Sequence, residues 1–136
     1  MDSVGQTIAL NKKPMRYFET GASRDTADGK IDPEGYLSPL VIKRFSEYML
    51  ENQMQADGKI RPSDNWQKGI PRDAYMSSGF RHFLDWWLEH RNHESREGME
   101  KALCGLLFNT MGYLHEHLKE KQNVQQHKQT DPRFRW

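Results

Sequence analysis

The sequence predicts an all-α fold: an antiparallel helical bundle of about three main helices, with long N-terminal loops, completed by oligomerisation. Three segments carry apolar residues at three- and four-residue intervals, which is the period of a helix that buries one face. A short connection between the second and third segments favours an antiparallel pair. The 136 residues fit one domain, but a hydrophobic fraction of 35% gives a lone copy a limited core, which association would relieve.

The N-terminal part of the chain is predicted to be irregular. Residues 1–17 show no sustained period and are expected to form an arm ahead of one helical domain over residues 18–121. Residues 18–30 are rich in turn formers and hold two glycines, which allow a backbone to approach a ligand closely. We expect a loop there, with Arg24 and Lys30 as candidates to neutralise phosphates and Asp25 as a further ligand contact.

The first main helix is predicted over about residues 38–53. Ser38 is a capping residue placed just before Pro39, and proline suits the first helical turn. Apolar residues follow at helical spacing: Leu40, Val41, Phe45, Tyr48 and Met49.

The turn-rich segment over residues 61–71 is the most informative part of the chain. It offers cations for phosphate oxygens, polar groups for hydrogen-bonding edges and a flat ring for a base. The cations are Arg61, Lys68 and, just after the segment, Arg72. The polar groups are those of Asp64 and Asn65, and the ring is that of Trp66. The combination indicates a nucleotide, and the alternative is a surface loop pinned by one buried tryptophan.

The second helix follows Pro71, with Asp73 as its expected cap. Its apolar stripe comprises Met76, Phe80, Phe83, Leu84, Trp87 and Leu88. A polar face lies on the side away from that stripe and comprises Ser78, His82, Asp85 and Glu89, while Arg81 adds a cation beside His82. Trp86 is off the stripe, so it is the better candidate for a ring contact or a subunit interface, although packing is the simpler role for both tryptophans.

The third helix is predicted from about Ser95 to Leu118. Its glycines Gly98, Gly105 and Gly112 recur every seven residues on one face, which favours close helix packing. Asn109 is polar in an apolar helix and needs a partner, either a ligand or another helix. From residue 122 to 136 the composition is polar, and we expect a disordered tail.

Acidic side chains on the second and third helices can converge near their short connection. Glu97 and Glu100 are three residues apart on one side of a helix and would face Asp85 and Glu89. Such carboxylates suit Mg²⁺, which bridges protein acids to substrate phosphates. Asp85 or Glu89 could then orient a water or take its proton, and His82 could donate a proton or bind a phosphate. The alternatives are solvated acids and a structural histidine.

Composition excludes several other classes of protein. With 20 basic and 19 acidic residues the net charge is +1, so no duplex-binding footprint is expected. No apolar run is long enough to span a bilayer, and the histidine pairs do not reach the ligand count of a zinc site. A single Cys104 in an apolar helix, with no secretory leader at the start, predicts a buried small hydrophobe in a cytoplasmic protein.

Several blocks together resemble the phage-type dATP/dGTP diphosphohydrolase domain family. They cover about residues 18–118, and the segment Asn65-Trp66-Gln67-Lys68-Gly69-Ile70 is the most specific of them. The others are Phe18-Glu19-Thr20-Gly21-Ala22 with Arg24-Asp25 and Gly29-Lys30, Ser78 with Arg81-His82, and Ala102-Leu103-Cys104 leading to Asn109.

The resemblance implies an all-helical fold akin to the MazG-like nucleotide pyrophosphohydrolases, which are often oligomeric and use Mg²⁺ held by helix-borne acids. The implied activity converts a purine dNTP to the dNMP and pyrophosphate. A phage origin, and hence the host cytoplasm, is also implied. Residues of the matching blocks, including Arg81 and Asn109, become candidate substrate contacts.

Two other functions stay open. The MazG-like pattern pairs two Glu-x-x-Glu/Asp motifs, whereas this chain has one clear pair, Glu97 with Glu100, and Lys101 stands beside it. That thinner set favours a catalytically silent protein that sequesters a nucleotide, such as a host signal. A helical adaptor that holds a protein partner through its tail is the third possibility.

Overall fold

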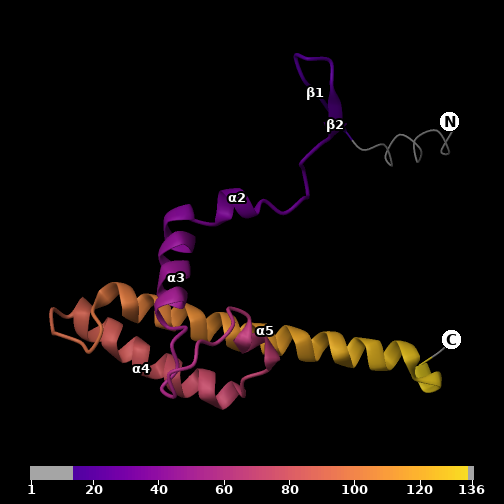
Figure 1. Ribbon diagram of the computed structural model, residues 1–136. Coiled ribbons are helices and arrows are strands. Elements are labelled where there is room, and N and C mark those ends of the chain that lie inside the picture. Colours follow the sequence, from indigo (N-terminus) through magenta and orange to yellow (C-terminus); the bar gives the residue numbers. More distant parts are fainter. Residues whose placement is uncertain (1–13, 135–136) are drawn as a thin grey trace, which may run out of the picture. The chain divides into compact units, whose positions relative to one another are not determined.

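The computed structural model describes residues 14–134, so most of the predicted arm and the last two residues of the predicted tail lie outside the described part of the chain. The protein is mostly helical, as predicted (Figure 1). It divides into two compact units, residues 1–38 and 39–136.

The first unit contains a small hairpin, with one strand at the end of the predicted arm and the other in the predicted loop. Strand β1 (Met15–Tyr17) pairs antiparallel with β2 (Ser23–Asp25). Gly21, at φ +89°, closes the turn and donates its N–H to the carbonyl of Phe18 at 2.9 Å. Three residues a strand are too few for a periodic signal, which explains why the sequence does not predict them. Helix α2 (Pro33–Tyr36) is a single turn capped by the side chain of Asp32.

The second unit holds the three predicted main helices. They are α3 (Pro39–Glu51), α4 (Arg72–His90) and α5 (Met99–Thr130), with a short 3-10 turn η1 (Asn65–Lys68) between the first two. Figure 1 shows α3 steeply inclined to the pair formed by α4 and α5. Two ion pairs join α3 to α5: Arg44 Nε to Glu100 Oε1 at 3.2 Å and Lys101 Nζ to Glu51 Oε2 at 3.7 Å.

Helices α4 and α5 pack antiparallel through small residues, as the glycine spacing predicts. A Cβ added at Gly105 would collide with the His82 ring, and one added at Gly112 would collide with the Tyr75 ring. Gly79 of α4 faces Asn109 of α5 in the same register. Gly98 differs from the other two spaced glycines, because it precedes α5 at φ +82° and a Cβ added there would meet no atom within 4 Å.

The apolar stripe predicted for the second helix lies on the outside of this pair. Met76, Phe80 and Trp87 are 56%, 69% and 53% exposed, while Tyr75, at 2%, and Asp85, at 3%, are buried. Trp86 is half-buried against Phe83 with ring centroids 5.8 Å apart, so Trp87 is the more exposed tryptophan. The glycines let the polar faces of the two helices approach closely. The helices therefore pack through these faces, and the predicted apolar stripe stays on the outside.

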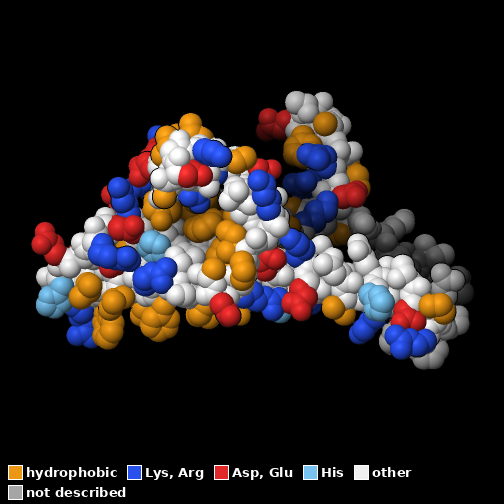
Figure 2. All heavy atoms as spheres, turned by 60° about the horizontal axis from the view of Figure 1, so that its bottom comes forward, with side chains coloured by type: hydrophobic (Ala, Val, Ile, Leu, Met, Phe, Trp, Pro, Cys, Tyr) orange, Lys and Arg blue, Asp and Glu red, His pale blue; other side chains and the backbone are white. Residues whose placement is uncertain are grey.

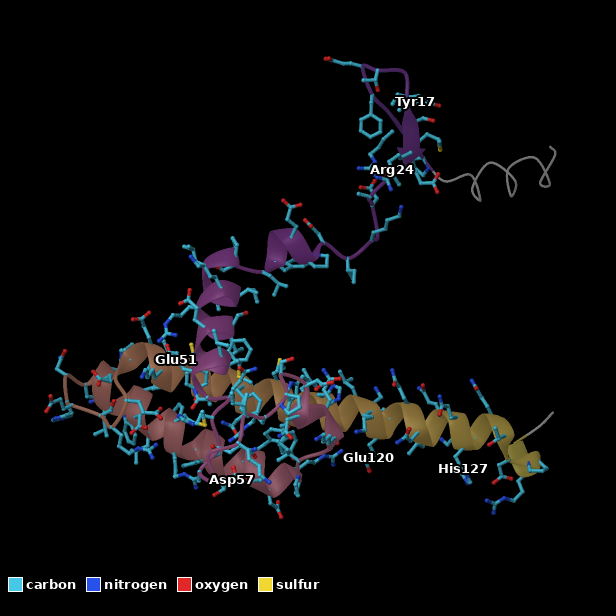
Figure 3. The ribbon with its side chains drawn as sticks, viewed as in Figure 1. Tyr17, Arg24, Glu51, Asp57, Glu120 and His127 are labelled. Carbon is cyan, nitrogen blue, oxygen red and sulfur yellow. The ribbon has the colours of Figure 1, made fainter. Side chains whose placement is uncertain are left out.

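Helix α5 continues through most of the predicted disordered tail. It ends at Thr130, and a second 3-10 turn, η2 (Pro132–Phe134), follows. Extending a helix that is already nucleated costs far less than starting one, and Lys, Glu and Gln are good helix formers. Arg72 of α4 forms an ion pair with Glu120, which lies on α5 where it extends away from α4 (Figure 3).

Candidate functional site

A cavity of ≈520 Å³ lies within the second unit and is lined by α3, the 61–70 segment, α4 and α5. This volume is in the range of small-molecule sites, ~300–1,000 Å³. Six residues that the sequence marks for ligand contact, or places on the polar helix face, line it: Arg61, Asn65, Trp66, Ser78, His82 and Asn109. The structure therefore brings residues that are up to 48 positions apart in the sequence into one pocket.

Local turns hold the aromatic wall of this pocket. Asn65 donates its backbone N–H to the carbonyl of Pro62 at 3.1 Å, and Gln67 donates to Asp64 at 2.9 Å, which together wind η1. Gly69, at φ +113°, ends the turn in a conformation that favours glycine. The Trp66 ring meets His115 of α5 edge-on at 4.8 Å, so this tryptophan both pins the loop and lines the cavity.

Fewer cations line the pocket than the sequence predicts. Arg61 is in the lining, whereas Lys68 and Arg81 are not. Arg81 instead donates to Ser77 Oγ one turn earlier on α4, at 3.0 Å. Arg24 and Asp25 lie on β2 of the first unit, where Figure 3 labels Arg24, and Lys30 follows in the loop after β2.

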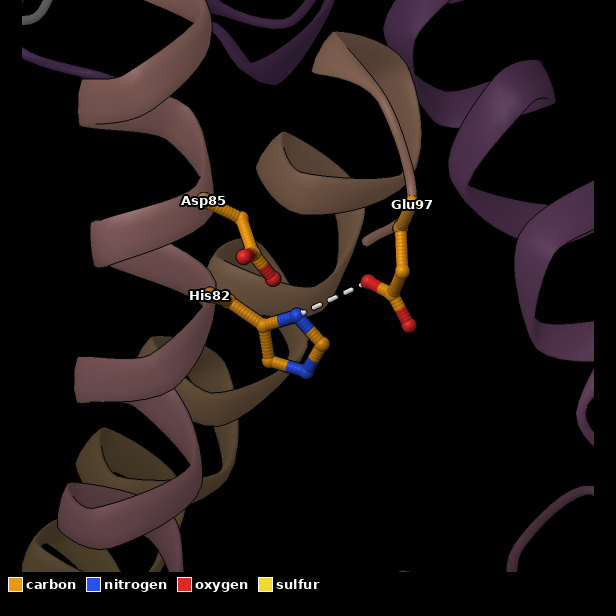
Figure 4. Close-up of side chains that lie close together, drawn as sticks. All are labelled: His82, Asp85 and Glu97. Atoms are coloured by element: carbon orange, nitrogen blue, oxygen red, sulfur yellow. Dashed lines mark ion pairs between the residues drawn. The ribbon is translucent and has the colours of Figure 1, made fainter. Parts of the chain in front are cut away.

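A cluster of three metal-ligating side chains adjoins the pocket. His82, Asp85 and Glu97 each offer one ligand atom, and these three atoms lie within 4.8 Å of one another (Figure 4). His82 Nδ1 is 3.1 Å from Glu97 Oε2 but lacks the alignment of a hydrogen bond, so this contact is an ion pair when the imidazole is protonated. Since His82 also lines the cavity, it links the cluster to the pocket.

Asp85 is held by Arg96, an arginine that no sequence pattern marked as part of a site. Arg96 donates to both carboxylate oxygens, with its Nη2 2.6 Å from Oδ2 and its Nε 3.3 Å from Oδ1. This hydrogen bonding lowers the pKa of the buried Asp85 carboxyl, against the effect of burial, and raises the pKa of Arg96. Asp85 is therefore a fixed carboxylate and a poor proton acceptor near neutral pH.

The other two predicted metal ligands have structural partners. Glu89 Oε1 accepts hydrogen bonds from the Ser95 backbone N–H at 3.2 Å and the Ser95 hydroxyl at 2.8 Å. Ser95 Oγ in turn accepts from the N–H of Gly98 at 3.0 Å, so Glu89 organises the α4–α5 connection. The side chain of Glu100 is 75% exposed and pairs with Arg44. The cluster that the described residues form thus contains two of the four predicted acids, Asp85 and Glu97.

The α3 wall of the pocket was not predicted as part of a site. Phe45, Tyr48 and Met49 line the cavity although their spacing indicates only a packed helix face. Tyr48 is buried, and burial, followed by the nearby Glu97 charge, raises the pKa of its hydroxyl. Asn52 and Gln53, two polar residues just after this helix, also line the cavity, and they were the one sequence feature that could have indicated a site here.

His82, Asp85 and Glu97 could hold a metal ion, and both Asp85 oxygens also accept hydrogen bonds from Arg96. Mg²⁺ is commonly bound by one or two carboxylates together with substrate phosphates, and Asp85 and Glu97 supply two. A histidine nitrogen is a less usual Mg²⁺ ligand, so His82 suits a hydrogen-bonding role beside the ion better than a ligand role. Cys104 takes no part: it is buried, and burial raises the pKa of its thiol, as expected for a small core residue.

Comparison with protein-family models, with curated proteins and with solved structures finds no match to this chain. Among residues 14–134, no helix has both the length and the apolar character needed to cross a membrane.

Proposed function

We propose that the pocket binds a purine deoxynucleoside triphosphate and that the protein hydrolyses it to the monophosphate and pyrophosphate with Mg²⁺. The observation that carries this proposal is the shared position of His82, which belongs both to the cavity that holds Trp66, Asn65 and Arg61 and to the cluster with Asp85 and Glu97. A ring contact and an arginine thus lie in the same cavity as the edge of an acidic site. The resemblance of residues 18–118 to phage-type dATP/dGTP diphosphohydrolases supports the same activity.

Each group in the pocket has a matching part of a nucleotide. The indole of Trp66 offers a face for the base, and the amides of Asn65 and Asn109 offer donors and acceptors for its edge. Asn109 already donates through Nδ2 to the carbonyl of Gly105 at 2.7 Å, which orients its oxygen. Arg61 would meet the phosphates. Lys68 and Arg81 of the second unit lie outside the lining and remain predictions from the sequence, as do Arg24, Asp25 and Lys30 of the first unit.

The reaction needs one water and no other co-reactant. A water oxygen bonds to the phosphorus nearest the sugar, and the bond from that phosphorus to the bridging oxygen breaks, so pyrophosphate leaves with the electron pair. Asp85 and Glu97 would hold Mg²⁺, which when bound polarises phosphoryl oxygens. Because Asp85 is fixed by Arg96, we assign the attacking water's proton to the Glu97–His82 pair.

Product analysis with purified protein tests the activity. We expect incubation with dATP or dGTP and MgCl₂ to yield equal amounts of dNMP and pyrophosphate, resolved by anion-exchange chromatography. Glu97→Gln should lower turnover by about 10²–10⁴-fold, because a proton acceptor and a metal ligand are lost. Glu94→Gln, an exposed acid in the same connection, is the matched control and should retain the wild-type rate. Orthophosphate as the product, or full activity in Glu97→Gln, would refute the proposal.

A second function, nucleotide binding without hydrolysis, is favoured by the pairing of the acids. Asp85 pairs with Arg96, and Glu97 Oε2 lies 3.1 Å from His82 Nδ1, so each carboxylate already has a protein group beside it. A binder of this kind would sequester its nucleotide. Two results together would favour the binder over the hydrolase: tight binding of a nucleotide in the presence of EDTA, and no product after prolonged incubation of that nucleotide with the protein and Mg²⁺.

The expected homo-oligomer and the cytoplasmic location also remain proposals. A lone cysteine with a buried thiol fits a reducing compartment.

A further inference from the structure

Tyr48 is a buried tyrosine in the α3 wall of the ≈520 Å³ pocket. It is 8% exposed, and its backbone carbonyl accepts a hydrogen bond from Asn52 Nδ2 at 2.7 Å. Its hydroxyl, in contrast, takes part in no hydrogen bond with residues 14–134. A buried hydroxyl without a partner is costly, and most such groups are satisfied by a further molecule when the protein does not satisfy them. The hydroxyl is therefore available to a ligand in the pocket.

Ion pairs on either side of Tyr48 direct its ring toward the start of α5. Arg44 comes one helical turn before Tyr48 and Glu51 one turn after it, so the three side chains share a face of α3. Arg44 Nε lies 3.2 Å from Glu100 Oε1, and Glu51 Oε2 lies 3.7 Å from the ammonium group of the next residue of α5. The Tyr48 ring between them faces the first turn of α5, which Glu97 precedes.

The Tyr48 hydroxyl lies on the side of the pocket where the metal-ligating side chains gather. Burial, followed by the nearby charge of Glu97, raises the pKa of this hydroxyl, so it is protonated and able to donate at neutral pH. His82, which belongs to the cluster with Glu97, lines the same cavity as Tyr48. A hydroxyl donor beside such a cluster suits an oxygen that carries negative charge.

Single donors matter in this pocket because the charges of the protein are balanced. Figure 2 shows Lys and Arg side chains interspersed with Asp and Glu over the face drawn. The net charge of the chain is +1, and Arg61 is the one Lys or Arg among the described residues that line the cavity. A polyphosphate therefore gains little from the overall field of the protein and depends on donors placed within the cavity.

We propose that the Tyr48 hydroxyl donates a hydrogen bond to a phosphoryl oxygen of the bound triphosphate, on the side of the pocket next to Glu97. The inference rests on the proposed nucleotide pocket and adds a substrate contact from α3. A donor that is fixed by its helix orients the phosphates before water attacks, and its hydrogen bond strengthens as negative charge gathers on that oxygen. The contact itself needs no hydrolysis, so it holds equally for a protein that only binds its nucleotide.

Titration calorimetry of Tyr48→Phe tests the contact separately from the reaction. The probe is a dATP analogue in which a methylene replaces the oxygen between the first and second phosphorus atoms, so the bond that the proposed reaction breaks is absent. With MgCl₂ present, the analogue should bind Tyr48→Phe about tenfold or more weakly than the wild type, as expected for one lost hydrogen bond to a charged group. Deoxyadenosine, which has no phosphate, should bind both proteins equally.

Tyr75→Phe is the matched control. It removes another hydroxyl without a hydrogen-bond partner, from a tyrosine that is 2% exposed and lines a second hollow, of ≈630 Å³, in place of the first. The analogue should bind this variant as it binds the wild type. The thermal midpoints of both variants should equal or exceed that of the wild type, because each variant loses an unpaired hydroxyl and keeps its ring.

Three results would overturn the proposal. They are an unchanged affinity of Tyr48→Phe for the analogue, a loss of affinity that deoxyadenosine shares, and a large fall in the thermal midpoint of Tyr48→Phe, which would show that the hydroxyl has a partner within the protein. Failure of the wild type to bind the analogue would refute the nucleotide pocket together with this contact. Binding that depends on Tyr48 without release of pyrophosphate from dATP would refute the proposed hydrolysis and support the contact.

Discussion

At the scale of single residues, the ion pair between Asp85 and Arg96 decides how the acidic cluster behaves. Asp85 is 3% exposed, and a buried carboxylate without partners is costly. Arg96 offsets that cost with hydrogen bonds to both oxygens, and its own side chain stays 58% exposed. The pair therefore holds the α4–α5 connection and keeps Asp85 ionised.

Replacing Arg96 with methionine should destabilise the fold. The change leaves the Asp85 carboxylate buried without its donor, and an unsatisfied buried group costs about 1–3 kcal/mol. We expect less than the roughly 3–5 kcal/mol of a fully buried pair, because water reaches the Arg96 position. Urea unfolding at pH 7 measures the loss, and Arg91→Met, at an exposed site beyond α4, is the control.

The same variant predicts a pH dependence of known sign. Arg96 lowers the pKa of folded Asp85, so the stabilisation is present above the unfolded aspartate pKa of about 3.9 and is lost as pH falls through the folded pKa. In the variant, burial raises the pKa of Asp85 instead. The stability difference between the two proteins should therefore shrink as pH falls through the raised pKa of Asp85 in the variant and then through its lowered pKa in the wild type. A difference that is constant from pH 3 to pH 7 would show that the pair is not its source.

Residue types were predictable from the sequence, but their partners were not. The polar face of the second helix and the 61–71 segment are local patterns, and they supply part of the pocket, whereas α3 with the residues that follow it supplies as large a part that was not predicted. Glu100 meets Arg44, which is 56 positions away, and Asp85 meets Arg96 across the helix connection. Such pairings depend on how elements pack, which a periodic pattern does not contain.

At the scale of elements, glycines set the contact between α4 and α5. The rings of Tyr75 and His82 lie against Gly112 and Gly105, in the space that a side chain would otherwise fill. The glycine period predicted this contact, and the apolar stripe on the same helices predicted a competing one. The bounds of α3 follow from local signals and were predicted to within two residues, whereas α5 runs on to Thr130 where the sequence predicts a disordered tail. The choice of packed face depends on which of the two surfaces allows the closer approach.

Gly112→Ala should destabilise the protein although alanine is the better helix former. Propensity alone would add roughly 1 kcal/mol of stability, but the new methyl would overlap the Tyr75 ring, and overpacking costs about 1–3 kcal/mol. Thermal or urea unfolding gives the sign. Lys121→Ala, on an exposed turn of α5, should be nearly neutral.

A second substitution shows whether the ring causes the effect. In a Tyr75→Ala background the obstruction is gone, so Gly112→Ala should become neutral or stabilising, and the two changes should be strongly non-additive. Additive effects would mean that the helices pack in another register.

At the scale of the whole molecule, the second unit carries two hollows with different chemistry on the two sides of one helix pair. The ≈520 Å³ hollow has amides, an arginine, an indole and an acidic cluster at its edge, which suits a charged ligand with a ring. The ≈630 Å³ hollow has a mostly apolar lining, with Asn109, Thr110 and His117 among its residues.

Calorimetric titration of dATP and dGTP into the protein, with Mg²⁺ present, tests the central claim of a nucleotide pocket most directly. We predict saturable binding to the wild type and about tenfold or greater weakening in Arg61→Gln, because a hydrogen bond to a charged group contributes about 1.5–3 kcal/mol. Arg91→Gln, an exposed arginine outside the pocket, should bind as the wild type does. No heat of binding with any dNTP, or equal weakening in both variants, would contradict the account.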